Sequence, residues 1–309
     1  MILSLQHFMT KKASRRLLDK RKKIKMKQIV GVDIGGSHIS AGLLDNQSLS
    51  ILDEKVSRCP VDSRGSKEEI LNAWTECILS LGITEAACLG IAMPAPFNYE
   101  QGISLIIDQG KYRSLYQVNL KEELSVRLSI PAGNIAYIND AAAFLQGEAF
   151  VAGWSKTERL MGITLGTGLG GSYKFGEMAE DGAFWSIPFK GGIAEDLIST
   201  SFFVQWAKAK HGIEVDGLKT LLSNQELRQA TLNVLKEFGQ NLAELMLIQM
   251  EGKSIDKVVI GGNMVKAADL FLPEVKRVLH AHSSSPKIFI SKLGEKAAMI
   301  GAASLFEGN

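Results

Sequence analysis

The chain has 309 residues, long enough for two domains of ordinary size, and its 46% hydrophobic and 22% charged residues are typical of a soluble globular protein. Its net charge of +2 is unevenly distributed: ten Lys and Arg and one Asp give residues 1–27 a charge of +9, which leaves −7 for residues 28–309. An acidic body does not suit a nucleic-acid-binding surface. No apolar run can span a bilayer and the apolar start of the chain is too short for a secretory signal, so we expect a cytoplasmic protein that does not act at a membrane.

Residues 1–27 are predicted to form a basic extension, either disordered or a frayed helix, and Met26 is an alternative start of the protein. The other interpretation is a tether to nucleic acid or membrane, although the segment is too short for a helix-turn-helix domain. Under either interpretation we expect the folded body to begin at residue 28.

The body opens with a predicted β-hairpin over residues 30–44, whose first strand ends at Asp33 and whose turn contains Gly35, Gly36 and Ser37. Glycine lets a polyanion approach the main chain, and successive backbone N–H groups in such a turn form a concave anion site. A carboxylate beside a bare phosphate would repel it, so Asp33 indicates an intervening Mg²⁺, which prefers oxygen ligands and keeps several waters. The segment therefore predicts a loop that holds a metal-complexed phosphate.

Alternating strands and helices follow this hairpin. The pattern predicts a strand over 50–58, a helix over 66–81, a buried strand over 86–92, a helix over 115–128 and a buried strand over 134–138. The last strand ends at Asn139 and Asp140, and a helix over 141–151 begins at once. Ligands of open α/β sheets bind at the carboxyl ends of strands, and a helix N-terminus favours a negative group. Asp140 is therefore a candidate site residue, although Asp at this position is also a common N-cap.

Residues 161–173 repeat the pattern of the first hairpin without a gap, with a glycine-rich turn at 166–168. Thr164 occupies the place of Asp33, so the second loop lacks the carboxylate that would face a metal. Two related hairpins about 130 positions apart predict an internal duplication. Two such loops facing each other could grip both ends of a triphosphate.

The rest of the chain continues the alternation. We expect an irregular aromatic segment over 178–194, helices over 194–209 and within 225–250, strands over 257–260 and 288–290, and a helix over 295–305. Gly261 and Gly262 follow one of these strands, where they would let a ligand ring lie against the backbone or would simply form a turn. The repeated order predicts two related α/β halves with a cleft between them.

These residues resemble the ROK family of repressors, open reading frames and sugar kinases, and the resemblance covers residues 28 to about 305. It implies an α/β fold of the actin/hexokinase-like (ribonuclease H-like) type, duplicated into two domains with an interdomain cleft. The implied N-terminal domain comprises 28–140 plus 295–309, and the C-terminal domain comprises 141–294. Beside the closing helix at 295–303, five blocks in register carry the resemblance: Asp33-Ile34-Gly35-Gly36-Ser37, Gly90-Ile91-Ala92-Met93-Pro94, Asn139-Asp140-Ala141-Ala142-Ala143 with Gly147-Glu148, Gly166-Thr167-Gly168-Leu169-Gly170-Gly171, and Val259-Ile260-Gly261-Gly262-Asn263.

The resemblance also implies roles for single residues. Asp140 matches the catalytic base, Asn139 and Glu195 match residues that contact the sugar, and Asp108 or Gln109 replaces a further sugar-binding Asn. The implied ATP- and phosphate-binding residues are Asp33, Gly35, Gly36 and Ser37 in the first loop, Gly166, Thr167 and Gly168 in the second, and Gly261 and Gly262 beside the adenosine. Through water, Asp33 would also hold Mg²⁺.

The zinc-binding block of the family has no counterpart in this chain. Residues 182–192 contain neither Cys nor His, and the three cysteines (Cys59, Cys77 and Cys88) all lie in the first third of the chain without a CxxC pair. A thiolate zinc site cannot be built from these residues, so we expect no zinc. The family's missing His and Glu also help bind the sugar, so the sugar pocket is expected to differ. Trp185 offers a stacking face for a sugar, or packs within its loop.

The resemblance implies a glucokinase-like enzyme that uses ATP and Mg²⁺ to phosphorylate a hydroxyl of a hexose or amino sugar, with Asp140 as general base. The alternative is a sugar-sensing regulatory protein with weak or no kinase activity, which the altered 182–192 region favours and the acidic body opposes. A kinase acting on a carboxylate is a third interpretation, opposed by Glu195. Family members are often dimers or tetramers, so we expect a homodimer or larger homo-oligomer whose partner is a small-molecule sugar and not nucleic acid or membrane.

Overall fold

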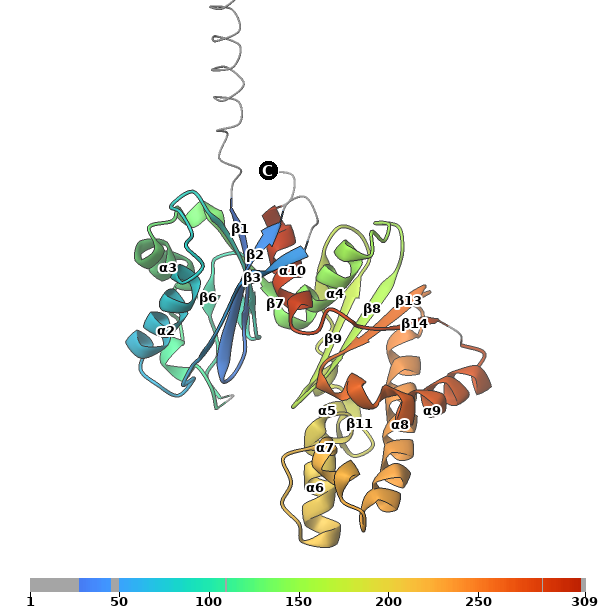
Figure 1. The fold of residues 1–309 in the computed structure, drawn as a ribbon. Coiled ribbons are helices and arrows are strands. Elements are labelled where there is room, and N and C mark those ends of the chain that lie inside the picture. Colours follow the sequence, from blue (N-terminus) through green and yellow to red (C-terminus); the bar gives the residue numbers. More distant parts are fainter. Residues whose placement is uncertain (1–27, 46–49, 109, 285, 307–309) are drawn as a thin grey trace, which may run out of the picture.

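The structure is a computed structural model that describes residues 28–45, 50–108, 110–284 and 286–306. The extension predicted for residues 1–27 lies outside the described residues. Figure 1 shows two α/β halves, each built around one five-stranded sheet. In the part of the chain that is described, no helix has both the length and the apolar character that crossing a bilayer requires.

The first sheet has the strand order β3-β2-β1-β4-β7. Strand β1 pairs antiparallel with β2 and parallel with β4, which pairs parallel with β7. The two central strands are almost entirely buried, which explains why their sequences are continuous apolar runs. The strands span Ile29–Ile34 (β1), His38–Asp45 (β2), Ser50–Pro60 (β3), Cys88–Met93 (β4) and Ile135–Asn139 (β7).

The second sheet repeats this arrangement with the order β10-β9-β8-β13-β14. Its first pair, β8 with β9, is antiparallel, and β13 lies parallel between β8 and β14. The equivalent order and directions in both sheets confirm the predicted duplicated α/β fold. The strands span Leu160–Leu165 (β8), Leu169–Lys174 (β9), Ala179–Asp181 (β10), Lys257–Gly261 (β13) and Lys287–Ile290 (β14).

The turns of the two equivalent hairpins differ in length by one residue. In the first hairpin Ile34 pairs with Ile39, whereas in the second Leu165 pairs with Leu169. The gapless match predicted from the sequence therefore holds only up to the turn and shifts by one residue after it. The longer first turn follows Asp33, the residue expected to lie near a metal.

Helices cover the outer face of each sheet, and two more lie side by side between the sheets (Figure 1). Apolar side chains of α2 and α3 share one core with β1 and β4, and those of α8 and α9 share another with β8 and β13. The inner pair, α4 and α10, shares a third cluster with residues of both sheets. These helices span Lys67–Leu79 (α2), Leu120–Leu128 (α3), Asp140–Val151 (α4), Arg228–Met250 (α8), Ala268–Ala281 (α9) and Lys296–Ala303 (α10).

The inner helices touch through glycines. A Cβ atom built on Gly301 of α10 would lie 1.8 Å from the carbonyl oxygen of Ala143 in α4, and one built on Gly147 would lie 2.0 Å from the carbonyl oxygen of Ala297. Real carbon and oxygen atoms do not approach so closely, so only glycine permits this helix contact. The contact fixes α4, whose first residue is Asp140, against the helix that also packs on β1 and β4.

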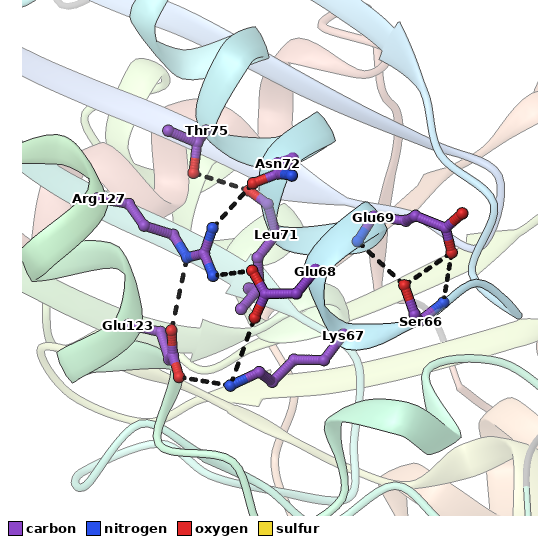
Figure 2. Close-up of polar contacts among 9 residues, drawn as sticks. All are labelled: Ser66, Lys67, Glu68, Glu69, Leu71, Asn72, Thr75, Glu123 and Arg127. Carbon is purple, nitrogen blue, oxygen red and sulfur yellow. Dashed lines mark hydrogen bonds and ion pairs between the residues drawn. The ribbon is translucent and has the colours of Figure 1, made fainter.

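Helix α2 shows how local sequence sets an element. Ser66 is its N-cap: the hydroxyl accepts a hydrogen bond from the backbone N–H of Glu69, whose carboxylate accepts one from the Ser66 N–H in return. The Arg127 guanidinium then joins α3 to α2 by contacting Glu68 at 2.6 Å and Asn72 at 2.8 Å (Figure 2). The predicted apolar face of this helix is buried, as expected.

Several predicted helices have other bounds in the structure. Helix α3 begins at Leu120, not near 115, because the Asn119 side chain caps it there. The helix predicted over 194–209 is divided into two, and the segment before it contains one strand of the second sheet and a short hairpin. The additional elements are β5 (Phe97–Asn98), β6 (Ile103–Ser104), β11 (Pro188–Phe189), β12 (Gly192–Ile193), α5 (Ala194–Leu197), α6 (Thr200–His211) and α7 (Leu218–Ser223).

Candidate functional site

A cleft with a cavity volume of about 560 Å³ lies between the two halves. Both sheets contribute to it through the carboxyl ends of their strands, as expected for this class of fold. Its lining comprises Pro94, Ala95, Lys111, Asn139, Asp140, Ala141, Thr164, Gly166, Gly168, Leu169, Gly170, Asp181, Trp185, Glu195, Gly262 and Asn263. The cleft therefore brings together predicted residues that are more than 120 positions apart in the sequence, such as Asn139 and Gly262.

Asp140 lies in this cleft at the junction of β7 and α4. The N-cap of α4 is Asn139 and not Asp140: the Asn139 Oδ1 atom accepts hydrogen bonds from the N–H groups of Ala141 at 2.9 Å and Ala142 at 3.1 Å. The Asp140 carboxylate accepts one bond from the Ala141 N–H at 2.8 Å and is otherwise open to the cleft. Because its neighbour supplies the cap, Asp140 remains available to a ligand.

The surroundings of Asp140 make it a stronger base than an ordinary aspartate. Enclosure by the cleft walls raises the pKa of Asp140 by desolvation, and the nearby Asp181 carboxylate raises it further. The Ala141 N–H and the positive charge of Lys111 act in the opposite direction. The net effect is a raised pKa, which is the change that suits a carboxylate to accept a proton near neutral pH.

The second loop is held in place by the start of α6. The Thr200 N–H donates to the Gly166 carbonyl at 2.8 Å, and the Ser201 hydroxyl donates to the Thr167 carbonyl at 3.0 Å. Gly166 and Gly168 line the cleft, whereas Thr167 is not among the lining residues. With its carbonyls occupied in this way, the loop is a fixed wall of the cleft.

Glu195 lies directly against this loop. Its Oε2 atom accepts a hydrogen bond from the Leu169 N–H at 2.8 Å, and a Cβ atom on Gly168 would lie only 2.4 Å from the same oxygen. Gly168 is therefore required for the approach of Glu195, not only for the turn. The predicted sugar-contacting carboxylate and the predicted phosphate loop thus form one unit.

The predicted adenosine-facing motif joins the same wall. Gly262 has a φ of 87°, in the region that favours glycine, and a Cβ atom there would lie 2.3 Å from the Leu165 carbonyl oxygen. Gly262 and Asn263 line the cleft, whereas Gly261 packs behind them against the ring of Phe144. Position 262 is therefore restricted to glycine by both conformation and space.

The first loop belongs to the other half of the molecule, between β1 and β2 of the first sheet. The predicted phosphate-binding residues Asp33, Gly35, Gly36 and Ser37 are not among the residues that line the cavity. Asp33 is the next-to-last residue of β1 and is half-buried. Burial together with the charges of Asp140 and Glu295 raises its pKa to about 7, while the charge of Arg58 opposes this rise. A divalent cation with oxygen preference would stabilise the charged form of a carboxylate whose pKa is raised in this way. The single carboxylate of Asp33 therefore fits the prediction that it holds Mg²⁺ through water.

Sequence reasoning did not assign several residues that line the cleft, among them Lys111, Asp181 and Thr164. Lys111 and Asp181 are charged, but no motif marks them, because tertiary packing brings them to the site. Asp108, predicted to contact sugar, is not among the lining residues, and its exposed carboxylate lies 3.5 Å from the guanidinium of Arg113. Gln109, its alternative, lies outside the described residues.

Trp185, for which the sequence leaves both stacking on a sugar and packing within its loop open, lines the cleft with 41% of its surface exposed. Within the described parts of the chain, no group of three or more His, Cys, Asp or Glu side chains is arranged to hold a metal ion.

The short hairpin of β11 and β12 contacts α8 through Lys190, whose ammonium lies 2.7 Å from both Asn241 Oδ1 and Glu244 Oε2.

Sequence comparison with known proteins finds glucokinases among the relatives of this chain. The chain is 31% identical to a glucokinase of Thermotoga maritima over 146 residues, 47% of this chain and 43% of that protein. It is 25% identical to a glucokinase of Streptomyces coelicolor over 320 residues, covering 89% of this chain and 96% of that protein.

The fold comparison agrees. The crystal structure of a ROK family glucokinase from Streptomyces griseus, in complex with glucose and AMPPNP, matches with a TM-score of 0.68 at 21% identity. The match covers 90% of this chain and 98% of that one, and it confirms the predicted actin/hexokinase-like fold. The family model for ROK proteins matches residues 29–185 and 188–309. The chain therefore belongs to the ROK family.

Proposed function

We propose that this protein is a sugar kinase that transfers the γ-phosphate of ATP to a hydroxyl of a hexose or amino sugar, with Asp140 as general base. The observation that carries the proposal is the state of Asp140. It lies in the cleft, it is free of the capping role, and its pKa is raised by its enclosure. These are the properties of a proton acceptor in phosphoryl transfer.

The proposed reaction requires few steps from the protein. Asp140 accepts the proton of the sugar hydroxyl as its oxygen attacks the γ-phosphorus. The bond between that phosphorus and its bridging oxygen breaks, and its electron pair leaves with ADP. When bound, Mg²⁺ neutralises phosphate charge, and Asp33 would hold it through water. The backbone N–H groups of the two loops orient the phosphates.

The acceptor side of the cleft is polar and carboxylate-rich. Asp181 and Glu195 line it with Asp140, and Trp185 adds an apolar ring face. Carboxylates accept hydrogen bonds from hydroxyl or ammonium groups and repel anions, so this lining supports a neutral polyol or an amino sugar as acceptor. The fixed contact of Glu195 with the Leu169 N–H supports a coupling between sugar and phosphate positions.

A panel assay tests the proposal. ADP release would be measured with Mg-ATP and a set of hexoses, hexosamines and N-acetylated hexosamines, with binding of each sugar measured by calorimetry. We expect turnover with at least one sugar, accompanied by a phosphorylated product in the mass spectrum. Sugar binding without turnover on any member would contradict the kinase and favour the sugar-sensing alternative.

A further inference from the structure

Lys111 differs from the other residues in the cleft because it is the one that carries a positive charge among the described lining residues. It is half-buried, and its ammonium makes no hydrogen bond or ion pair with any described residue. The other charged residues that line the cleft are carboxylates, and Asp140 is close enough for the charge of Lys111 to oppose the rise in its pKa. A half-buried cation that no described residue pairs with in a hydrogen bond or ion pair, in a lining whose carboxylates would repel a polyphosphate, indicates an anionic ligand.

The main chain beside Lys111 is fixed to the first phosphate loop. The next residue, Tyr112, is fully buried, its hydroxyl donates to the Gly35 carbonyl at 2.5 Å, and its N–H donates to the Ser63 carbonyl at 2.6 Å. Its ring also packs edge-on against Trp74, with the centroids 5.4 Å apart. Lys111 is therefore positioned by a buried neighbour and not by its own side chain.

The Lys111 side chain extends across the first loop. Its Cδ atom lies 3.7 Å from the point that a Cβ atom of Gly36 would occupy, so its stem runs over the turn whose N–H groups are expected to face phosphate. From there its charge acts on Asp140, which follows β7 in the same sheet as the first loop. The side chain of Lys111 thus contacts the turn of the proposed donor loop, and its charge reaches the proposed base.

We propose that Lys111 binds a non-bridging oxygen of the transferred phosphoryl group and neutralises its charge during transfer. This inference rests on the proposed kinase function and adds a residue to it. The acceptor oxygen forms the new bond to phosphorus, Asp140 takes the acceptor proton, the bridging oxygen leaves with ADP, and Lys111 keeps its proton throughout. A lysine suits this role because its ammonium is a compact charge on a flexible stem, able to follow the moving group.

The test compares Lys111→Met and Lys111→Arg with the parent protein, and uses Lys276→Met, on an exposed position of α9, as a control for loss of one positive charge. We expect Lys111→Met to lower kcat by about 100-fold or more, as for removal of other transition-state donors, with the acceptor KM within about 3-fold. Lys111→Arg should recover part of the rate, and Lys276→Met should match the parent. An unchanged kcat with a raised acceptor KM would overturn the proposal, because Lys111 would then bind the sugar.

A binding measurement separates this inference from the kinase proposal. Calorimetry with Mg-ATP and with Mg-ADP does not depend on turnover, and only ATP carries the phosphoryl group that Lys111 is proposed to hold. We expect Lys111→Met to weaken ATP binding by about 10-fold and ADP binding by less than about 2-fold. This result would support the role of Lys111 even if no sugar in the panel were phosphorylated. Equal changes for both nucleotides, or none, would overturn it.

Discussion

The contact between α4 and α10 predicts a large effect from one methyl group. In Gly301→Ala, the new Cβ atom would lie 1.8 Å from the carbonyl oxygen of Ala143 and 2.8 Å from the N–H nitrogen of Gly147. Carbon and oxygen in close contact lie about 3.3 Å or more apart, so the helices would have to separate by about 1.5 Å. The neighbouring atoms belong to the backbone of a buried helix and cannot rotate away.

The expected loss follows from this geometry. Overpacking a well-packed core costs roughly 1–3 kcal/mol, and a clash with backbone belongs at the upper end, about 3 kcal/mol. At about 2–4 °C per kcal/mol, the Tm should fall by roughly 6–12 °C. Because α4 begins with Asp140, a shift on the order of 1 Å should also lower kcat by about 100-fold.

Thermal unfolding followed by circular dichroism, with ADP release measured below the transition, tests this prediction. The matched control is Gly133→Ala, because a Cβ atom there meets nothing within 4 Å and the backbone does not need glycine. That variant should unfold within about 1 kcal/mol of the parent and keep its activity. If Gly301→Ala unfolded at the parent Tm, the close approach of the two helices would be refuted.

Three further predictions follow from the site. The pKa of Asp140 is raised, and its deprotonated form is the proposed base. On acidification, kcat/KM should therefore begin to fall at a pH above the ordinary pKa range of an aspartate. A fall that begins only near pH 4 in the pH–rate profile would contradict this. Asn139→Ala and Ser66→Ala each remove a helix N-cap, so each should lower the free energy of unfolding by about 1 kcal/mol. Only Asn139→Ala should also reduce kcat, because Asn139 caps the helix that begins with Asp140. Equal kcat values for the two variants would contradict a role of the Asn139 cap in catalysis. Lys190→Ala removes the contacts of the β11–β12 hairpin with α8, and Glu195 follows this hairpin directly in the chain. The variant should therefore raise the acceptor KM and lower the free energy of unfolding in a urea titration by about 1–2 kcal/mol. An unchanged KM would show that the hairpin does not position Glu195.

The sequence predicted the hairpins and the ends of the strands because their signals are local. An apolar run followed by a glycine-rich turn predicts a strand and its loop without knowledge of neighbouring segments, as at Asp33 and Gly166. The order of these segments then indicated the duplication, and the carboxyl ends of the strands indicated where Asp140 and Gly262 meet.

Other features depended on contacts that the sequence does not express. Asn139 and Asp140 are adjacent polar residues before a helix, and which of them is the cap was decided by a difference of one residue in where α4 begins. Lys111 reaches the cleft because Tyr112 is buried against the first loop, a contact between segments 77 residues apart. The helix α9 was not predicted although Phe271 and Val275 have helical spacing, and Pro273 lies between them.

Transfer of phosphate to sugar with Asp140 as base is tested most directly by one comparison of the parent protein and Asp140→Asn. With the sugar that turns over best, the rate of sugar-phosphate formation would be measured by mass spectrometry, and the sugar Kd by calorimetry. We predict that Asp140→Asn binds the sugar with a Kd within about 3-fold of the parent and forms the product at least about 100-fold more slowly. Product formation by Asp140→Asn at the parent rate would contradict the account.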